Sequence, residues 1–364
     1  MKLLPIGIQN LEKIIKNNYI YIDKTKYLYD LIQTGSYYFI SRPRRFGKSL
    51  TCSTFAEIFS GNKELFKNCL IYNSDYNWQK YPVIEFNFNS IAHNSKSQLI
   101  LGLNEKLNDI AKKQKIDLSD YQTLESKFYN LIEKTSINHK SKVVVIIYEY
   151  DKAIVDNISN IEEAEEIKNV LSNFYGVIKD LDQYLKFFFL TGVSKFSKTS
   201  IFSKLNNLED LTISKNSSTL MGYTKKEIEI YFDKYIEKIR IEQNISKEVF
   251  LESIKNWYNG YCFYPKAEKV YNPFSILNYL KQENFQNFWF ESGTPTFLIN
   301  LIKEKDYPIP EIENALVNHT DLNSFDVNNI KLLTLLFQTG YLTIKEYNPE
   351  TRICESLRLK SRSF

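Results

Sequence analysis

Residues 41–49, Ser-Arg-Pro-Arg-Arg-Phe-Gly-Lys-Ser, constrain the fold of this chain more than any other stretch. They follow the apolar run 37–40, which is typical of a buried strand, and precede residues 50–59, where apolar side chains recur at helical spacing. Strand, loop, Gly-Lys-Ser and helix form the setting of a phosphate-binding P-loop, because unpaired N–H groups at a helix N-terminus attract an anion.

Each residue type in this loop has a physical role in phosphate binding. Gly47 lets the backbone approach the phosphate, Lys48 reaches the β- and γ-phosphates, and Ser49 places its hydroxyl on Mg²⁺. The spacing departs from the usual motif, because Arg42 stands where a first glycine is expected. A basic turn that caps a helix is the plain alternative, and the flanking strand and helix favour the P-loop.

The rest of the chain first alternates strands and helices and then becomes mainly helical. Strand patterns occur at 83–89, 143–147 and 186–190, and helical patterns at 8–16, 23–34, 95–114, 119–135 and 160–182. This alternation predicts an α/β domain with a mostly parallel sheet. Later helical patterns lie at 224–238, 246–257, 273–282, 294–304 and 328–338, with hairpin patterns at 260–271 and 341–354. We expect a P-loop domain at 1–214, a helical lid-like domain at 215–305 and a winged-helix-like module at 306–364.

Composition excludes several classes of protein. The chain has 47 basic and 43 acidic residues, and this balance does not indicate a nucleic-acid-binding protein as a whole. Four scattered cysteines and three histidines argue against a zinc site. No apolar run reaches the length of a membrane span, and the N-terminus lacks the apolar core of a signal peptide. We therefore expect a cytoplasmic protein with no membrane partner.

Several short motifs resemble the AAA-ATPase-like family. They include Leu-Pro-Ile-Gly at 4–7, Tyr-Ile-Asp-Lys-Thr at 21–25 and the arginine-rich loop at 42–49, which is the most specific. Further matches lie at 149–152, 190–194, 200–208, 257–261, 272–275 and 289–295, so the resemblance covers about residues 4–346. It implies a P-loop NTPase fold that uses ATP and Mg²⁺.

In that family the ATPase domain is often followed by a PD-(D/E)XK nuclease-like domain. The C-terminal part of this chain has no separated Asp and Glu-x-Lys set that would make a nuclease centre. We expect the ATPase part alone, either as a separate protein or as a truncated copy of a longer fusion.

The resemblance also implies which residues hold the nucleotide. These are Arg42, Arg44, Arg45, Phe46, Gly47, Lys48, Ser49 and Leu50 in the loop, and Thr191 after a later strand. The arginines either stabilise transferred charge or pair with acidic residues of the core. Thr191 either contacts the γ-phosphate or caps its strand. Tyr19 and Tyr21 either stack on adenine or pack in the core.

The segment after strand 143–147 departs from the family pattern Asp-Glu-Tyr-Asp-Lys-Pro of the Walker B region. Tyr148 replaces the Mg²⁺-binding Asp, and tyrosine is a poor ligand because its phenol pKa is about 10. Glu149 remains as the catalytic residue that orients water. Asp151 would take over metal binding beside Ser49, since residues two apart on an extended strand share a side. An ordinary acidic strand end is the plain alternative.

We therefore expect an ATP-binding, Mg²⁺-dependent protein whose hydrolysis is weak or absent, and which is an ATPase if active. The alternative is a non-enzymatic interaction module or DNA-associated scaffold derived from an ATPase–nuclease fusion. DNA contact would use the basic C-terminal residues, although these also suit a solvated tail: Arg352, Arg358, Lys360 and Arg362. The sequence does not indicate an oligomeric state.

Overall fold

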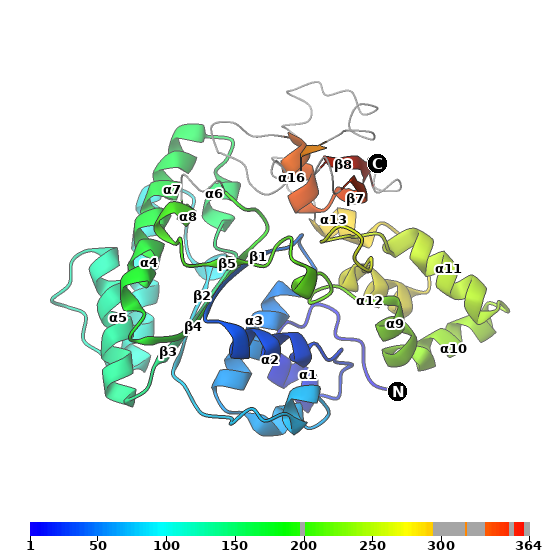
Figure 1. Ribbon diagram of the computed structural model, residues 1–364, viewed down its shortest axis with the longest axis horizontal. Coiled ribbons are helices and arrows are strands. Elements are labelled where there is room, and N and C mark those ends of the chain that lie inside the picture. Colours follow the sequence, from blue (N-terminus) through cyan, green and yellow to red (C-terminus); the bar gives the residue numbers. More distant parts are fainter. Residues whose placement is uncertain (197–200, 294–316, 319–331, 349–352, 360–364) are drawn as a thin grey trace.

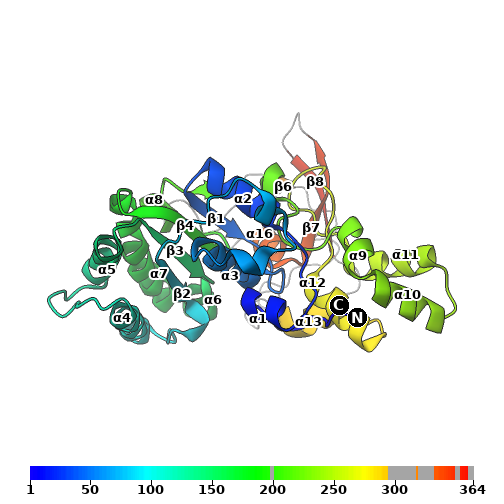
Figure 2. The same ribbon diagram turned by 90° about the horizontal axis from the view of Figure 1, so that it is seen from below.

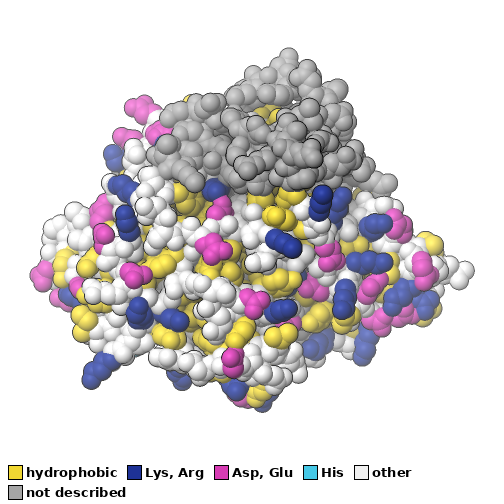
Figure 3. Space-filling view, in the orientation of Figure 1, with side chains coloured by type: hydrophobic (Ala, Val, Ile, Leu, Met, Phe, Trp, Pro, Cys, Tyr) yellow, Lys and Arg dark blue, Asp and Glu magenta, His cyan; other side chains and the backbone are white. Residues whose placement is uncertain are grey.

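The computed structural model describes residues 1–196, 201–293, 317–318, 332–348 and 353–359. These residues form an α/β unit, a group of helices and a small antiparallel sheet (Figure 1). Figure 2 shows helices α4 and α5 at one end of the molecule and α9–α11 at the other. On the face shown in Figure 3, basic and acidic side chains are interspersed over the described part, as expected from a nearly balanced charge.

A five-stranded, all-parallel sheet lies at the centre of the α/β unit and confirms the predicted fold class. Its strands, in the spatial order β2-β3-β4-β1-β5, are β2 (Val83–Asn87), β3 (Val143–Tyr148), β4 (Leu185–Gly192), β1 (Tyr37–Ser41) and β5 (Glu209–Asp210). Ser41 lies opposite Gly192, and Thr191 lies opposite Tyr148. The segments after β1 and β3 therefore leave the same edge of the sheet, one on either side of β4.

Helices cover both faces of this sheet, which explains its continuous apolar strands. On β3, Val143, Val145 and Ile147 join one apolar cluster, whereas Val144 and Ile146 join the other. The first cluster includes α4 (Lys96–Lys113), α5 (Leu124–His139), α6 (Lys152–Asp156), α7 (Ile161–Gly176) and α8 (Ile201–Lys204). The second includes α1 (Leu11–Lys16), α2 (Thr25–Thr34) and α3 (Lys48–Phe59).

The second group of helices follows the sheet. It comprises α9 (Lys225–Tyr231), α10 (Asp233–Glu242), α11 (Lys247–Tyr258), α12 (Pro273–Gln282) and α13 (Phe288–Gly293). The predicted capping box is present, because Thr224 Oγ1 accepts from the Glu227 N–H and the Glu227 carboxylate accepts from the Thr224 N–H. The single helix predicted at 224–238 is wrong, because Phe232 (φ −111°, ψ 12°) departs from helical geometry and separates α9 from α10. The Phe232 side chain is buried.

Five short 3₁₀ helices occur among the residues that the structure describes: η1 (Lys63–Phe66), η2 (Leu70–Asn73), η3 (Phe88–Ser90), η4 (Val177–Leu181) and η5 (Lys215–Ser217). The helix predicted at 160–182 is α7 continued by η4. The hairpin predicted at 260–271 is reduced in the described structure to an isolated bridge between Tyr261 and Val270.

The C-terminal part contains α16 (Leu332–Thr339), β7 (Leu342–Asn348), β8 (Ile353–Leu359) and β6 (Val317–Asn318). The strands form an antiparallel sheet in the order β6-β8-β7, so the predicted terminal hairpin is confirmed. The helix predicted at 294–304 and residues Arg352, Lys360 and Arg362 lie outside the described residues. The three domain boundaries and the winged-helix module stay predictions.

This C-terminal part packs on the α/β unit. Leu335 of α16 and Ile344 of β7 belong to the same apolar cluster as one face of the central sheet, and Trp289 of α13 joins them there. Within the described ranges, no helix combines the length and the apolar character needed to cross a bilayer.

The end of β4 generates a stability prediction. A Cβ on Gly192 would overlap the Asp151 carboxylate and lie 2.7 Å from the Tyr150 ring. We expect Gly192→Ala to lower the free energy of unfolding by about 1–3 kcal/mol in urea denaturation. Gly176→Ala in α7 is the matched control, because its Cβ would meet only the flexible Lys204 side chain, and alanine favours a helix. Equal losses in both variants would contradict the steric argument.

Candidate functional site

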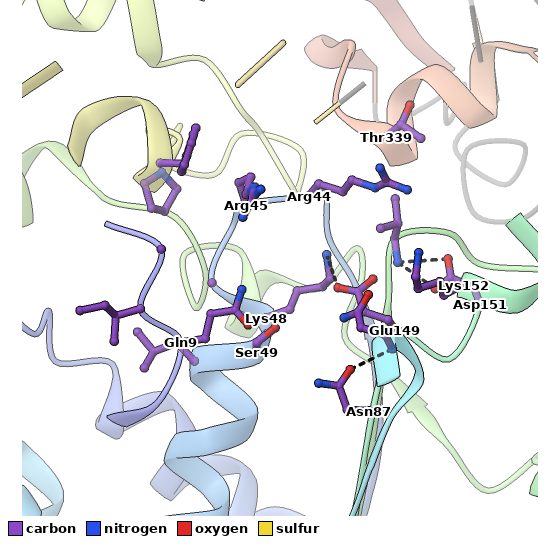
Figure 4. Close-up of a pocket in the computed structure, with 18 of the residues that line it drawn as sticks. Gln9, Arg44, Arg45, Lys48, Ser49, Asn87, Glu149, Asp151, Lys152 and Thr339 are labelled. Carbon is purple, nitrogen blue, oxygen red and sulfur yellow. Dashed lines mark hydrogen bonds and ion pairs between the residues drawn. The ribbon is translucent and has the colours of Figure 1, made fainter. Parts of the chain in front are cut away.

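A cavity of about 560 Å³ opens where β1, β3 and β4 end. Ligands of open α/β sheets bind outside the carboxyl ends of the strands, and this cavity has that position. Its wall combines Pro5 and residues 7–9, residues 44, 45 and 47–50 of the loop, the segment after β3 and the start of α12 (Figure 4). Thr339, at the end of α16, completes it.

The loop before α3 leaves the helix N-terminus open to this cavity. Gly47 caps α3 with a left-handed backbone (φ 95°), and no atom lies within 4 Å of the place a Cβ would occupy. The first N–H groups of a helix have no intrahelical acceptor, so they are available to an anion. Arg45 (φ 66°) and Glu149 (φ 52°) also adopt left-handed backbones and line the cavity. Such strained residues gather at functional sites.

Lys48 and Glu149 meet across the end of β4, as Figure 4 shows. Lys48 Nζ donates to the carbonyls of Arg42 at 3.0 Å and Pro43 at 3.2 Å, and lies 3.4 Å from Glu149 Oε1. The Lys48 side chain is 4% exposed. The structure therefore holds a desolvated cation at the helix N-terminus, beside the acidic residue predicted to orient water.

Arg42 points into the protein and does not line the cavity. Its guanidinium donates to the carbonyls of Ser41 (2.9 Å), Thr212 (2.7 Å) and Ser217 (3.1 Å). It also lies over the Phe263 ring, 4.1 Å from the centroid. Burial lowers the pKa of Arg42 to about 9, although the charge of Asp210 opposes this shift. The side chain of Arg42 thus anchors the loop through backbone carbonyls.

Two other predicted nucleotide contacts are also directed inward. The Phe46 ring packs edge-on against Tyr261 at 4.6 Å and Phe263 at 5.4 Å. The buried Thr191 hydroxyl donates to the Ile40 carbonyl at 2.8 Å, which is the strand-capping role. Neither side chain lines the cavity, whereas the remaining predicted loop residues do: Arg44, Arg45, Gly47, Lys48, Ser49 and Leu50.

Asp151 lies at the cavity wall but is tied to the turn after β4. Its carboxylate accepts from the backbone N–H of Val193 at 3.1 Å and of Ser194 at 2.6 Å. Burial and the nearby charge of Glu149 raise the pKa of Asp151 to about 6, against the opposing effect of these hydrogen bonds. Its predicted use as a metal ligand would compete with both bonds.

Tyr148, which was predicted to replace a metal-binding aspartate, is directed toward a neighbouring strand. Its hydroxyl donates to the Glu85 carboxylate on β2, and its ring packs against the apolar cluster beside α3. Burial raises the pKa of Glu85, which favours the uncharged acid. The Tyr148 hydroxyl is therefore engaged by a carboxylate of the neighbouring strand β2.

The donor set fits a phosphate group better than a metal held by protein alone. The described residues contain no group of three His, Cys, Asp or Glu side chains that could hold a metal ion. Ser49 and Glu149 both line the cavity, next to the open N-terminus of α3. Mg²⁺ commonly binds through one or two protein oxygens together with substrate phosphates, so Ser49 would hold it only with a nucleotide present.

Several cavity residues were not predicted from the sequence. Asn87 is the last residue of β2 and Asn89 follows this strand. The expectation that ligands bind outside the carboxyl ends of the strands, which identified Glu149, could also have identified them. Phe274 lies in the family-like motif at 272–275 but was not predicted to line a site, and Thr339 belongs to none of the motifs found in the sequence. Tyr19 and Tyr21, one alternative for adenine stacking, do not line the cavity, and Tyr21 packs against the apolar cluster beside α3.

The raised pKa of Asp151 predicts a pH effect on stability. A carboxyl with a folded pKa of about 6 and an unfolded pKa near ~3.9 favours the folded state when protonated. This stability is fully present below pH ~4 and is lost as the pH rises through about 6, at a cost on the order of 3 kcal/mol. The unfolding free energy of Asp151→Asn should lack this pH-dependent contribution. Unfolding free energies measured from pH 4 to 7 check it, and parallel curves for the two proteins would refute it.

Comparisons with known proteins agree with this geometry. The model of the family described as "Predicted AAA-ATPase" matches residues 5–202. The chain is also similar, at 38% identity over 351 residues, to an uncharacterised protein in the vnfD 5′ region of Azotobacter chroococcum mcd 1. That match covers 94% of this chain and 64% of the relative. No solved structure matches the chain. The segment matched by the family model contains Lys48, Glu149, the loop before α3 and every strand of the central sheet except β5. The chain therefore belongs to the predicted AAA-ATPase family.

Proposed function

We propose that the chain binds ATP with Mg²⁺ in the cavity at the carboxyl edge of the sheet. The observation that carries this proposal is Lys48, a buried cation fixed by two loop carbonyls at the open N-terminus of α3. Family membership supports a nucleotide as the ligand. The cavity volume of about 560 Å³ lies within the range of small-molecule sites.

Each residue near α3 has a defined part in this proposal. The N–H groups after Gly47 and the Lys48 ammonium bind phosphate oxygens. The Ser49 hydroxyl ligates Mg²⁺, which would neutralise charge on the phosphates. An incoming phosphate competes with Glu149 for Lys48, because the ion pair uses the same ammonium group. Glu149, once released, is available to accept a proton from water.

Hydrolysis is expected to be weak because of Tyr148. The tyrosine hydroxyl donates to Glu85 and cannot supply the negative charge that an aspartate would offer to a metal. Nucleotide binding depends on other residues, so it survives this change better than turnover does.

Removing the Lys48 ammonium tests the assignment of the site. Lys48→Ala should weaken ATP binding by about 10- to 100-fold, since hydrogen bonds to charged groups contribute about 1.5–3 kcal/mol. Fluorescently labelled ATP provides the titration. Lys152→Ala is the matched control, because Lys152 lines the same cavity but is paired with Asp156 at 2.6 Å, and we expect a change below about threefold. Unchanged affinity in Lys48→Ala would remove the basis of the proposal.

Restoring the acidic residue tests the explanation for weak turnover. Tyr148→Asp should raise the steady-state rate of phosphate release by about tenfold or more, because a carboxylate stabilises the metal. Tyr148→Phe is the control, since it removes the same hydroxyl without adding charge and should give no gain. An equal rate in Tyr148→Asp and the parent would show that this position does not limit hydrolysis.

A second candidate is a non-enzymatic scaffold that uses the nucleotide fold without a ligand. The pairing of Lys48 with Glu149 favours it, because the buried cation is already neutralised within the chain. Thermal melting with and without Mg·ATP discriminates between the two. A ligand at 100 times its Kd stabilises the folded state by about 2.7 kcal/mol. No shift at millimolar ATP would favour the scaffold.

A further inference from the structure

The three arginines of the loop are used in three different ways. Arg42 is buried against backbone carbonyls. Arg45 places its guanidinium 5.0 Å from the centroid of the Phe274 ring on α12. Arg44 lines the cavity, is half-buried, and forms no ion pair with any carboxylate of the described residues. It is therefore a cation at the cavity wall whose charge no acidic side chain of the described part balances.

Arg44 extends toward the side of the cavity where β4 ends. In Figure 4 its side chain runs from the loop toward Thr339 and the segment that holds Asp151, beyond the Lys48–Glu149 pair. Arg45 instead contacts α12. A polyphosphate that starts at Gly47 and passes Lys48 reaches its terminal group beside Glu149. Arg44 thus lies on the side of the terminal phosphate.

The backbone of Arg44 is fixed by the C-terminal part of the chain. Trp289 Nε1 donates to the Arg44 carbonyl at 3.0 Å, and the Trp289 side chain is 5% exposed. Gly340 has φ 92°, and a Cβ there would lie 2.8 Å from the Pro43 ring and 3.3 Å from the indole. These contacts restrict the backbone of residues 43 and 44. A pre-positioned backbone reduces the entropy that the long arginine side chain loses on binding.

We propose that Arg44 recognises the γ-phosphate and sets the preference of this site for nucleoside triphosphates over diphosphates, with Trp289 as its positioning residue. The inference rests on the proposed nucleotide function and adds the group that discriminates the phosphate number. A guanidinium presents paired N–H donors that match two phosphate oxygens. A diphosphate lacks the terminal group, so it gains nothing from Arg44.

The test compares equilibrium affinities for Mg·ADP and for a non-hydrolysable Mg·ATP analogue. Arg44→Ala should weaken analogue binding by about 10- to 100-fold, as expected for lost charge-assisted hydrogen bonds, and ADP binding by less than about threefold. Arg44→Gln should show the same selective loss of affinity for the ATP analogue. Because glutamine keeps a long polar side chain, agreement between the two variants would show that the loss does not come from a folding defect. Arg44→Lys keeps the positive charge but loses the paired N–H donors of the guanidinium, and should retain part of the preference for the triphosphate.

Two further variants separate this role from a general one. Arg45→Ala removes the same charge from the adjacent position and should leave the ratio of the two affinities unchanged. Trp289→Phe keeps the ring but removes the N–H donor. It should lower the triphosphate preference by a few-fold with little change in ADP affinity, a selective effect that a purely structural loss would not produce.

The outcomes distinguish the inference from the function beneath it. If the parent protein binds neither nucleotide, the proposed function fails and the inference fails with it. If the parent binds both, and Arg44→Ala and Arg44→Gln weaken both equally or neither, the inference alone is overturned. Selective loss of the triphosphate in both variants, with an unchanged ratio in Arg45→Ala, supports it.

Discussion

The site depends on the position of β4 between β1 and β3. Neighbouring strands lie about 4.8 Å apart, so the loop after β1 and the acidic segment after β3 are separated by about 10 Å. Lys48 bridges this gap to Glu149, over a strand end where Gly192 carries no side chain. The Asp151 carboxylate fills that space and binds the N–H groups of the turn after β4. The pairing of β4 with β1 on one side and β3 on the other therefore brings Lys48, Glu149 and the open N-terminus of α3 together.

The loop is anchored by side chains that a phosphate would not touch. Arg42 occupies the position where a first glycine is usual, and its guanidinium binds carbonyls at residues 212 and 217, beyond β5. Phe46 packs against Tyr261 and Phe263, which belong to the segment between α11 and α12. At the position where a glycine is usual, the buried side chain of Arg42 therefore connects the loop to residues 212 and 217 by hydrogen bonds.

The sequence predicted the elements well where a local pattern decides the structure. Buried parallel strands carry continuous apolar runs, so residues 143–147 and 186–190 were readable, and Gly47 with Lys48 marked the start of α3. The inward direction of Arg42 was not readable, because its acceptors lie about 170 residues away. The same limit applies to Tyr148, whose partner Glu85 lies on another strand.

The cavity wall was the least predictable part of the site. Phe274 and Thr339 line it through tertiary packing, and the residue type at neither position indicates a ligand. The break of the predicted helix at Phe232, a buried residue, was likewise not indicated by the local helical pattern. Local periodicity in the sequence predicts helices and strands. The site is formed by the way these elements pack together, which local periodicity does not predict.

The order in which the wall residues occur along the chain has a consequence for biosynthesis. The loop leaves the ribosome early, but Ser217, Phe274, Trp289 and residue 339 follow much later. Domains generally fold as units as synthesis proceeds. A nascent chain that ends before Ser217 exposes the loop without the carbonyls that hold Arg42, and one that ends before Trp289 lacks the support of Arg44. The wall of the cavity and the contacts that hold its loop are therefore completed only once residue 339 has been synthesised.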